Sequence, residues 1–170
     1  LVAGFRDGAG GRIGPEGLIV SAAVVVAGEA EESRNPKNEE RRREAADAAH
    51  RAEDLLAHLA TVTFVPKAEN VVLLGPPGIG KTHIAIGLGI HAAQAGYSVL
   101  FDTATNWIAR LATAHHAGAL ETELKKIRRY KLIIIDEVGY IPFDHDAANL
   151  FFQLVSSRYE HASLILPSNL

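Results

Sequence analysis

Short uninterrupted apolar runs alternate along the chain with longer stretches in which apolar residues recur at helical spacing. The runs have the length and composition of parallel strands that are covered on both faces. They lie at residues 70–74, 97–101, 132–135 and 163–167. Helical spacing predicts helices at about 38–60, 81–95 and 121–130, and in the stretches that follow residues 105 and 144. The alternation of strand and helix predicts an α/β fold in which helices flank a parallel sheet.

Individual residues refine these boundaries. Asn38 is a candidate N-cap for the first long helix, because its side chain can accept a backbone N–H and two glutamates follow it. Gly96 is a good stop for the helix before it. Gly87 and Gly89 weaken that same helix and so predict close packing against the sheet. Trp107 is expected in the core.

The chain divides into three parts by composition. Residues 1–37 are rich in Gly, Ala and Val without a convincing period, which predicts an irregular or disordered segment with Val24–Val26 as a candidate short strand. Residues 38–66 predict a helix followed by an extended, β-branched link. Residues 67–170 hold the alternating strands and helices, so this part is expected to carry the chemistry.

Composition excludes several classes of protein. With 170 residues, the chain suits one domain with a real core, or one domain with an appendage. A formal net charge of −3 argues against wholesale polyanion binding but leaves a local basic patch open. The absence of cysteine fits a cytoplasmic protein, and the apolar run at 18–27 is too short to span a membrane. There is also no methionine, so we expect a fragment or a conceptual translation.

The first chemical motif follows the strand at 70–74. It has the pattern G-x-x-x-x-G-K-[ST], with a strand before it and a helix after it. Its glycines let backbone N–H groups point into one concavity, and the start of the helix adds further donors. Lys81 would reach the β- and γ-phosphates of a nucleotide, and the Thr82 hydroxyl would hold Mg²⁺. The candidate nucleotide-binding residues are Gly75, Pro76, Pro77, Gly78, Ile79, Gly80, Lys81, Thr82 and His83.

The second chemical motif closes the strand at 132–135. Asp136 and Glu137 follow its last apolar residue, at the carboxyl end where open α/β sheets bind ligands. Asp136 can hold Mg²⁺, directly or through water, beside Thr82. Glu137 can orient and deprotonate an attacking water. Asn169 lies just past the last strand, where its amide can bond the γ-phosphate or that water.

Other polar residues leave two interpretations open. The basic runs at 41–43 and 125–129 either contact nucleic acid or form solvated helix faces, and the solvated face is favoured for both. His83 either contacts the nucleotide or lies on the surface. His91 is expected to be a packed or exposed helix residue rather than a ligand. The pair His115-His116 lacks further ligands at metal spacing.

From about residue 69 onward, the sequence resembles the AAA+ ATPases of the IstB/DnaC type. These are transposition helper proteins of insertion sequences and the related bacterial helicase loaders. The Gly-Tyr-Ile-Pro and Arg-Tyr-Glu segments favour the IstB branch. The segments that carry the resemblance are Glu69–His83, Leu132–Pro142, Ala148–Phe152, Ser157–Glu160 and Ser168-Asn169.

The resemblance implies a P-loop NTPase sheet with strand order 5-1-4-3-2, and an ATPase that uses ATP and Mg²⁺. Residues from Gly75 to Thr82 would bind the nucleotide, and Asp136 would hold the metal. The implied catalytic residues are Glu137 as the base, Lys81, and Asn169 as a sensing amide. Proteins of this type oligomerise on double-stranded DNA and use the ATP state to deliver or activate a transposase. Duplex DNA, a transposase and further copies of the chain are therefore the implied partners.

Three departures from the family pattern matter. Pro167 stands where the family usually has Thr, and a proline in a central strand removes a ladder donor near Asn169. Residues 1–50 do not resemble the family's N-terminal domain. The chain stops before the fifth strand, the inter-subunit arginine and the helical lid, so the first core strand is expected to be an exposed edge. Two alternatives stay open, a DnaC-type helicase loader and a nucleotide-binding remnant without turnover.

Overall fold

The computed structural model describes residues 19–22, 36–140 and 145–169. The candidate strand at Val24–Val26 lies outside these residues, and so does Asp144, which is one of two candidate N-caps, with Asp146, for the helix predicted after residue 144. Within them, no helix combines the length and the apolar composition that a membrane crossing requires. The elements in chain order are β1 (Ile19–Ala22), α1 (Pro36–Ala60), β2 (Asn70–Gly75), α2 (Lys81–Gln94), β3 (Val99–Thr103), α3 (Ala104–His116), α4 (Leu120–Ile127), β4 (Leu132–Asp136), the 3-10 turn η2 (Val138–Tyr140), α5 (His145–Ser156) and β5 (Ser163–Asn169).

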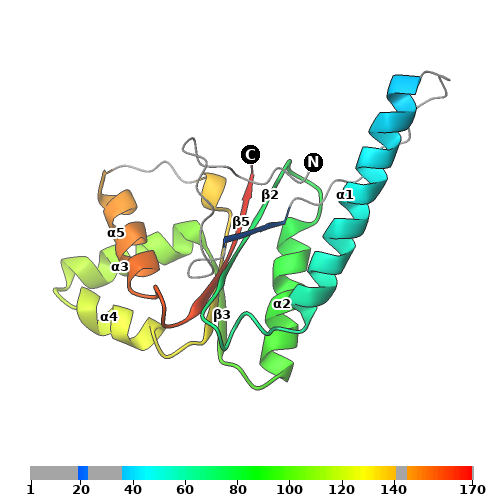
Figure 1. The fold of residues 1–170 in the computed structure, drawn as a ribbon. Helices are drawn as coiled ribbons and strands as arrows, with labels where there is room; N and C mark the ends of the chain where they lie inside the picture. The colour runs from blue at the N-terminus through cyan, green and yellow to red at the C-terminus, as the bar shows by residue number, and fades with distance from the viewer. Residues whose placement is uncertain (1–18, 23–35, 141–144, 170) are drawn as a thin grey trace.

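The strands form one parallel sheet in the order β1-β2-β5-β4-β3 (Figure 1). The four core strands β2, β5, β4 and β3 therefore lie in the order that the resemblance implied. Chain connections run from the carboxyl end of one strand, through a helix, to the start of the next. The predicted α/β architecture, a parallel sheet flanked by helices, is confirmed.

Strand β1 lies where the resemblance placed the fifth strand of the sheet. It pairs with β2 from Ile19 opposite Asn70 to Ala22 opposite Leu73. The expectation that β2 is an exposed edge is therefore wrong over these residues, because a segment predicted to be irregular supplies a neighbour. A strand of four residues is too short to show a period, so only the tertiary pairing reveals it.

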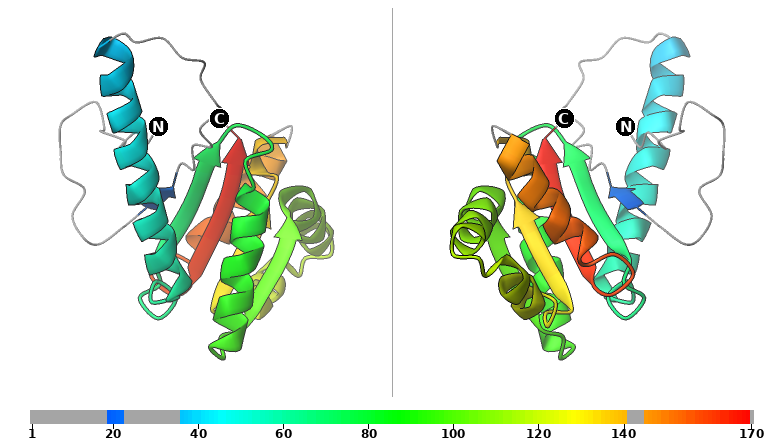
Figure 2. Two further views of the ribbon diagram at one scale, coloured as in Figure 1. Left: turned by 90° about the vertical axis from the view of Figure 1, so that its right-hand side faces the viewer. Right: turned by 90° about the vertical axis from the view of Figure 1, so that its left-hand side faces the viewer.

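Helices cover both faces of the sheet. The side views show α1 and α2 on one face and α3, α4 and α5 on the other (Figure 2). Alternate residues of β4 feed both layers, since Leu132 and Ile134 belong to the core beneath α2, whereas Ile133 and Ile135 belong to the core beneath α3 to α5. Every residue of β4 is buried, as its continuous apolar run predicted.

The segment before β2 differs from its prediction. Helix α1 begins at Pro36 rather than after Asn38, and proline suits a first helical turn because that turn needs no backbone donor there. Residues 61–68 form successive turns instead of an extended link, with Val62 at a φ of 51°. This compact path puts Phe64 and Val65 into the core that α2 shares with the sheet. The link is thus part of the core.

Helix α2 lies close to the sheet at one of its two glycines. A Cβ on Gly89 would lie 2.7 Å from Ile134 Cδ1 and 3.6 Å from Val99 Cγ1, so the close packing predicted for this position is confirmed. Gly87 has no such neighbour within 4 Å, and the prediction is wrong there. On the opposite layer, Trp107 is 1% exposed, as expected of a core residue.

A buried arginine ties the second layer together. Arg158 is 1% exposed, and its guanidinium donates to the carbonyls of Ile127 at 3.0 Å, Tyr130 at 2.8 Å and Ser163 at 3.3 Å. Burial lowers the pKa of this guanidinium to about 10. The side chain therefore caps the end of α4 and holds it against the start of β5.

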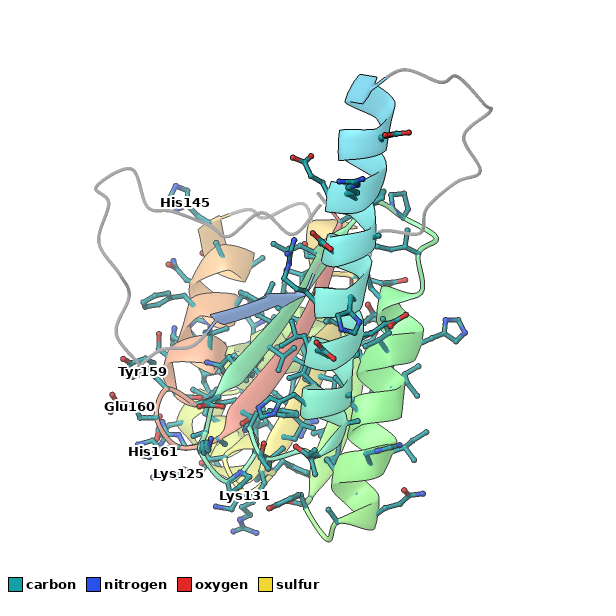
Figure 3. All side chains as sticks on the ribbon, turned by 45° about the vertical axis from the view of Figure 1, so that its right-hand side comes forward. Lys125, Lys131, His145, Tyr159, Glu160 and His161 are labelled. Atoms are coloured by element: carbon teal, nitrogen blue, oxygen red, sulfur yellow. The ribbon has the colours of Figure 1, made fainter. Side chains whose placement is uncertain are left out.

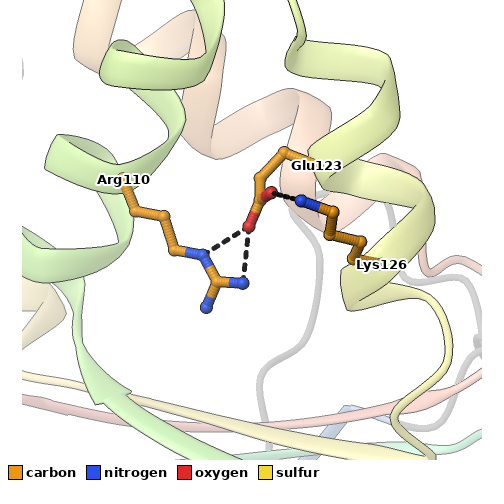
Figure 4. A network of polar contacts seen from close by, with 3 residues as sticks. All are labelled: Arg110, Glu123 and Lys126. Carbon is orange, nitrogen blue, oxygen red and sulfur yellow. Dashed lines mark hydrogen bonds and ion pairs between the residues drawn. The ribbon is translucent and has the colours of Figure 1, made fainter.

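A surface ion network joins α3 to α4 (Figure 4). Arg110 Nε donates to Glu123 Oε1 at 2.6 Å, and Lys126 Nζ donates to Oε2 at 3.1 Å. Arg110 also stacks over Trp107, with its Cζ 5.5 Å from the ring centroid. The hydrogen bond from Arg110 is the main reason why the pKa of Glu123 lies below its ordinary value of 4.5.

Glu123→Gln is expected to lower the free energy of unfolding at pH 7 by about 1 kcal/mol, the usual size of a partly exposed charge network. A lowered carboxyl pKa stabilises the fold above the unfolded pKa, and this contribution disappears as the pH falls through the folded pKa. The difference between wild type and variant should therefore shrink as the pH falls below 4.5 and through the lowered pKa of the folded state. Urea titrations at pH 7 and pH 3.5 measure this difference.

Glu121→Gln is the control for this prediction, because the contact of Glu121 with Arg128 is longer, at 3.6 Å, and more exposed. An equal loss of stability in both variants would contradict the prediction.

Candidate functional site

A cavity of about 290 Å³ opens at the carboxyl end of the sheet, where β2, β4 and β5 finish. Ligands of open α/β sheets bind at this end, in the crevice between strand ends and helix starts. The cavity brings together residues from the glycine-rich loop, the end of β4 and the end of β5. Its lining residues are Pro77, Gly78, Gly80, Lys81, Thr82, His83, Asp136, Glu137, Gly139, Pro167, Ser168 and Asn169.

Most of the candidate residues predicted from the sequence lie in this lining. Three do not. Gly75 is the buried last residue of β2, and Pro76 is exposed behind the loop. The side chain of Ile79 lies over Gly75, because a Cβ on Gly75 would collide with Cδ1 of Ile79. These three residues belong to the loop but not to the lining, whereas the others line the cavity.

The loop has the backbone that its glycines predicted. Gly78 and Gly80 both have a φ of 86°, in the left-handed region where residues with a Cβ are strained. Gly80 precedes α2, and its carbonyl accepts the first helical bond from the N–H of Ile84 at 3.0 Å. No side chain caps the helix, and its first turn has no acidic residue. The start of α2 can therefore attract an anion through its dipole and its backbone donors.

Lys81 places a positive charge at the cavity wall. Its side chain is 8% exposed, and Nζ donates to the carbonyls of Gly75 at 2.8 Å and Pro76 at 2.7 Å. An ammonium group has three donors, so two hold the loop and one remains for a ligand. The same two bonds fix the position of the ammonium group relative to the loop.

The acidic pair stands opposite, at the end of β4. Asp136 is 7% exposed, and its Oδ1 accepts the backbone N–H of Glu137 at 2.8 Å. Glu137 is exposed and has a φ of 60°, a left-handed conformation that costs a non-glycine residue about 1 kcal/mol or more. This turn places two carboxylates with different surroundings, one buried and one exposed, in the same cavity.

Three residues of the lining were not predicted as site residues, namely Gly139, Pro167 and Ser168. A Cβ on Gly139 would lie 3.6 Å from the backbone N of Asn169 and 3.7 Å from Ser168 Oγ. The turn η2 thus packs directly against the end of β5. No local pattern could have indicated this contact, because it joins segments about thirty residues apart.

The other polar candidates lie away from the cavity. His91 Nδ1 is 3.3 Å from the carbonyl of Ala60 at the end of α1, and His115 and His116 are exposed near the end of α3. In the basic run at the end of α4, Lys126 and Arg128 each contact a glutamate of the same helix. Those pairs support the solvated-face interpretation for half of that run.

Lys125 and Lys131 are exposed at the end of the molecule opposite His145, together with Tyr159, Glu160 and His161 (Figure 3). This end carries the amino ends of β4 and β5, whereas the cavity lies at their carboxyl ends. The basic run and the cavity are therefore at opposite ends of the strands.

Known structures share this fold. A crystal structure of the DnaC helicase loader superposes with a TM-score of 0.63 at 21% identity, covering 72% of this chain and 70% of that chain. The replication initiator DnaA bound to AMPPCP and single-stranded DNA gives a TM-score of 0.60 at 19% identity, covering 70% and 37%. At such low identity, the likeness concerns the fold alone.

Closer similarity is found in sequence. A protein of insertion sequence IS21 from Pseudomonas aeruginosa is 47% identical over 115 residues, which is 68% of this chain and 43% of the relative. A protein of insertion sequence IS5376 from Geobacillus stearothermophilus is 43% identical over 114 residues, covering 67% and 45%. The chain thus spans less than half the length of these relatives. Residues 41–170 match the family model described as IstB-like ATP binding protein, and the chain belongs to that family.

Proposed function

We propose that this chain is the ATP-binding and ATP-hydrolysing core of an insertion-sequence helper protein, which couples its ATP state to DNA binding and transposase activation. One observation carries the proposal. A single cavity joins the glycine-rich loop, with Lys81 and Thr82, to the carboxylates of Asp136 and Glu137 and the amide of Asn169. Anion-binding and water-activating groups are thereby combined in one site.

The residues present fit a triphosphate. The loop offers backbone donors around Gly78 and Gly80, the start of α2 offers its positive dipole end, and Lys81 offers a fixed charge. His83 lies exposed at the rim, one residue beyond Thr82. These groups would bind and orient the β- and γ-phosphates of a nucleotide, in the cavity that the ends of β4 and β5 also line.

The residues also fit Mg²⁺. Thr82 and Asp136 supply a hydroxyl and a carboxylate, and oxygen is the ligand that this cation prefers. When bound, Mg²⁺ neutralises charge on the phosphates. Asp136 holds one of its two oxygens on the N–H of Glu137, which orients the carboxylate. The exposed Glu137 takes the proton of the attacking water, and Asn169 helps to place that water.

Lys81→Ala is expected to weaken ATP binding by about tenfold to a hundredfold, because a hydrogen bond to a charged group contributes roughly 1.5–3 kcal/mol. Isothermal titration with ATP and Mg²⁺ measures the affinity, and a thermal melt checks that the loop bonds of Lys81 are not needed for folding. Lys131→Ala is the matched control, because Lys131 is exposed and lies outside the cavity. If Lys81→Ala bound ATP as tightly as Lys131→Ala, the assignment of the loop would be wrong.

The proposed role in transposition is supported by the names of the relatives. They belong to insertion sequences by name, which supports a helper of transposition over the alternative of a helicase loader. Duplex DNA, the transposase of the same insertion sequence and further copies of the chain are the proposed partners, in the cytoplasm. Co-purification of the chain with that transposase on duplex DNA, with and without ATP, tests the partnership. The absence of a complex both with ATP and without ATP would contradict it.

A further inference from the structure

The end of β5 is paired on one side only. Towards β2, the register continues from Val71 opposite Ile165 to Gly75 opposite Asn169. Towards β4, it ends at Ile134 opposite Ile165, although β4 continues to Asp136. The carboxyl ends of β4 and β5 therefore separate just before both strands reach the cavity.

Hydrogen-bond directions identify the cause. The N–H of Ser163 donates to the carbonyl of Lys131 at 3.0 Å, on the β4 side, whereas the N–H of Leu164 donates to Asn70 Oδ1 at 2.9 Å, on the β2 side. The backbone N–H groups of successive residues in a strand point alternately to the two neighbouring strands. The nitrogen of Pro167 therefore faces β4, and the same offset places it opposite the carbonyl of Ile135. Proline has no N–H to donate, so the ladder ends there.

The separated strand ends frame the cavity. Pro167, Ser168 and Asn169 line it from β5, and Asp136 and Glu137 line it from the end of β4. The turn η2 packs beside the freed end of β5, where Gly139 contacts the backbone of Asn169.

We propose that Pro167 is a positioning residue: by ending the β4–β5 ladder before Asp136, it sets the distance between Asn169 and the acidic pair. The inference rests on the proposed function, because that distance matters only if water attacks a phosphate between these groups. A residue with an N–H at position 167 extends the ladder to Ile135 and draws Asn169 towards Glu137. The distance between Asn169 and the acidic pair is thus larger than a continued β4–β5 ladder would impose.

Pro167→Val and Pro167→Thr test the inference, because both restore the N–H and both suit a strand. Hydrogen exchange followed by NMR should show the new amide of residue 167 protected. Steady-state ATPase kinetics should show kcat changed by about tenfold, since moving a contacting group by about 1 Å can change the rate by up to a hundredfold. The KM for ATP should stay within about threefold, because the loop is unchanged.

A double-mutant cycle with Asn169→Ala separates positioning from a general change in stability. If Pro167 acts through Asn169, the change in kcat disappears in the Asn169→Ala background. A freely exchanging amide at position 167, an unchanged kcat in both variants, or an equal change in kcat without Asn169 would overturn the inference. Failure of the proposed function is recognised separately, because the wild type would then show no ATP turnover while the exchange measurement still reports on the ladder.

Discussion

Glu137→Gln should bind ATP as tightly as the wild type and hydrolyse it at least about a hundredfold more slowly, the usual contribution of a general base. The amide has the shape of the carboxylate but cannot take a proton from water. Binding should persist, because Lys81 and the loop hold the phosphates independently of Glu137. Isothermal titration gives the affinity, and phosphate release under saturating ATP gives the turnover.

Glu160→Gln is the matched control for this experiment. Glu160 is also exposed and also has a left-handed backbone, with a φ of 59°, but it lies at the opposite end of the molecule (Figure 3). The same change of charge and the same backbone strain are thus tested outside the cavity. Equal turnover of the two variants would remove Glu137 from its role. A wild type that binds ATP without any turnover would instead favour the non-hydrolysing remnant.

Arg158→Ala should lower the free energy of unfolding by about 3 kcal/mol or more, because three carbonyls in a buried site lose their donor and a cavity remains. The carbonyls belong to Ile127, Tyr130 and Ser163, so the loss separates α4 from β5. Native domains have only about 5–15 kcal/mol of stability, so the effect is large. Urea denaturation at pH 7, followed by circular dichroism, measures it.

Arg128→Ala provides the comparison for this stability test. Arg128 is an exposed arginine on the same side of the sheet, with one contact of 3.6 Å to Glu121, and its loss should cost less than about 1 kcal/mol. Arg158→Lys should recover only part of the loss, because a single ammonium group cannot reproduce the planar fork of a guanidinium. Equal stability of Arg158→Ala and Arg128→Ala would show that the buried contacts contribute little.

The sequence predicted those parts of the molecule that depend on local pattern. The run at 132–135 is apolar throughout because β4 is buried on both faces, and Gly78 and Gly80 stand where the loop needs a left-handed backbone. Asp136 and Thr82 could be paired in advance, since motif spacing places both at strand or helix ends that meet at one edge of the sheet.

The parts that were missed depend on contacts between distant segments. Strand β1 is defined by its pairing with β2, and Gly139 by its contact with Asn169. Arg158 entered the sequence analysis only as part of the Arg-Tyr-Glu segment, yet the fold buries it against three carbonyls. The sequence singled out Pro167 as a strand residue without a donor; in the structure the pairing with β4 ends at Ile165, whereas the pairing with β2 continues past Pro167.

A crystal structure of the chain with Mg²⁺ and a non-hydrolysable ATP analogue tests the central claim most directly. The proposal predicts the β- and γ-phosphates on the backbone amides from Gly78 to Thr82, in contact with Lys81. It also predicts the metal between Thr82 and Asp136, and Glu137 facing the γ-phosphate. A nucleotide bound elsewhere, or a metal with no contact to either Thr82 or Asp136, would contradict it.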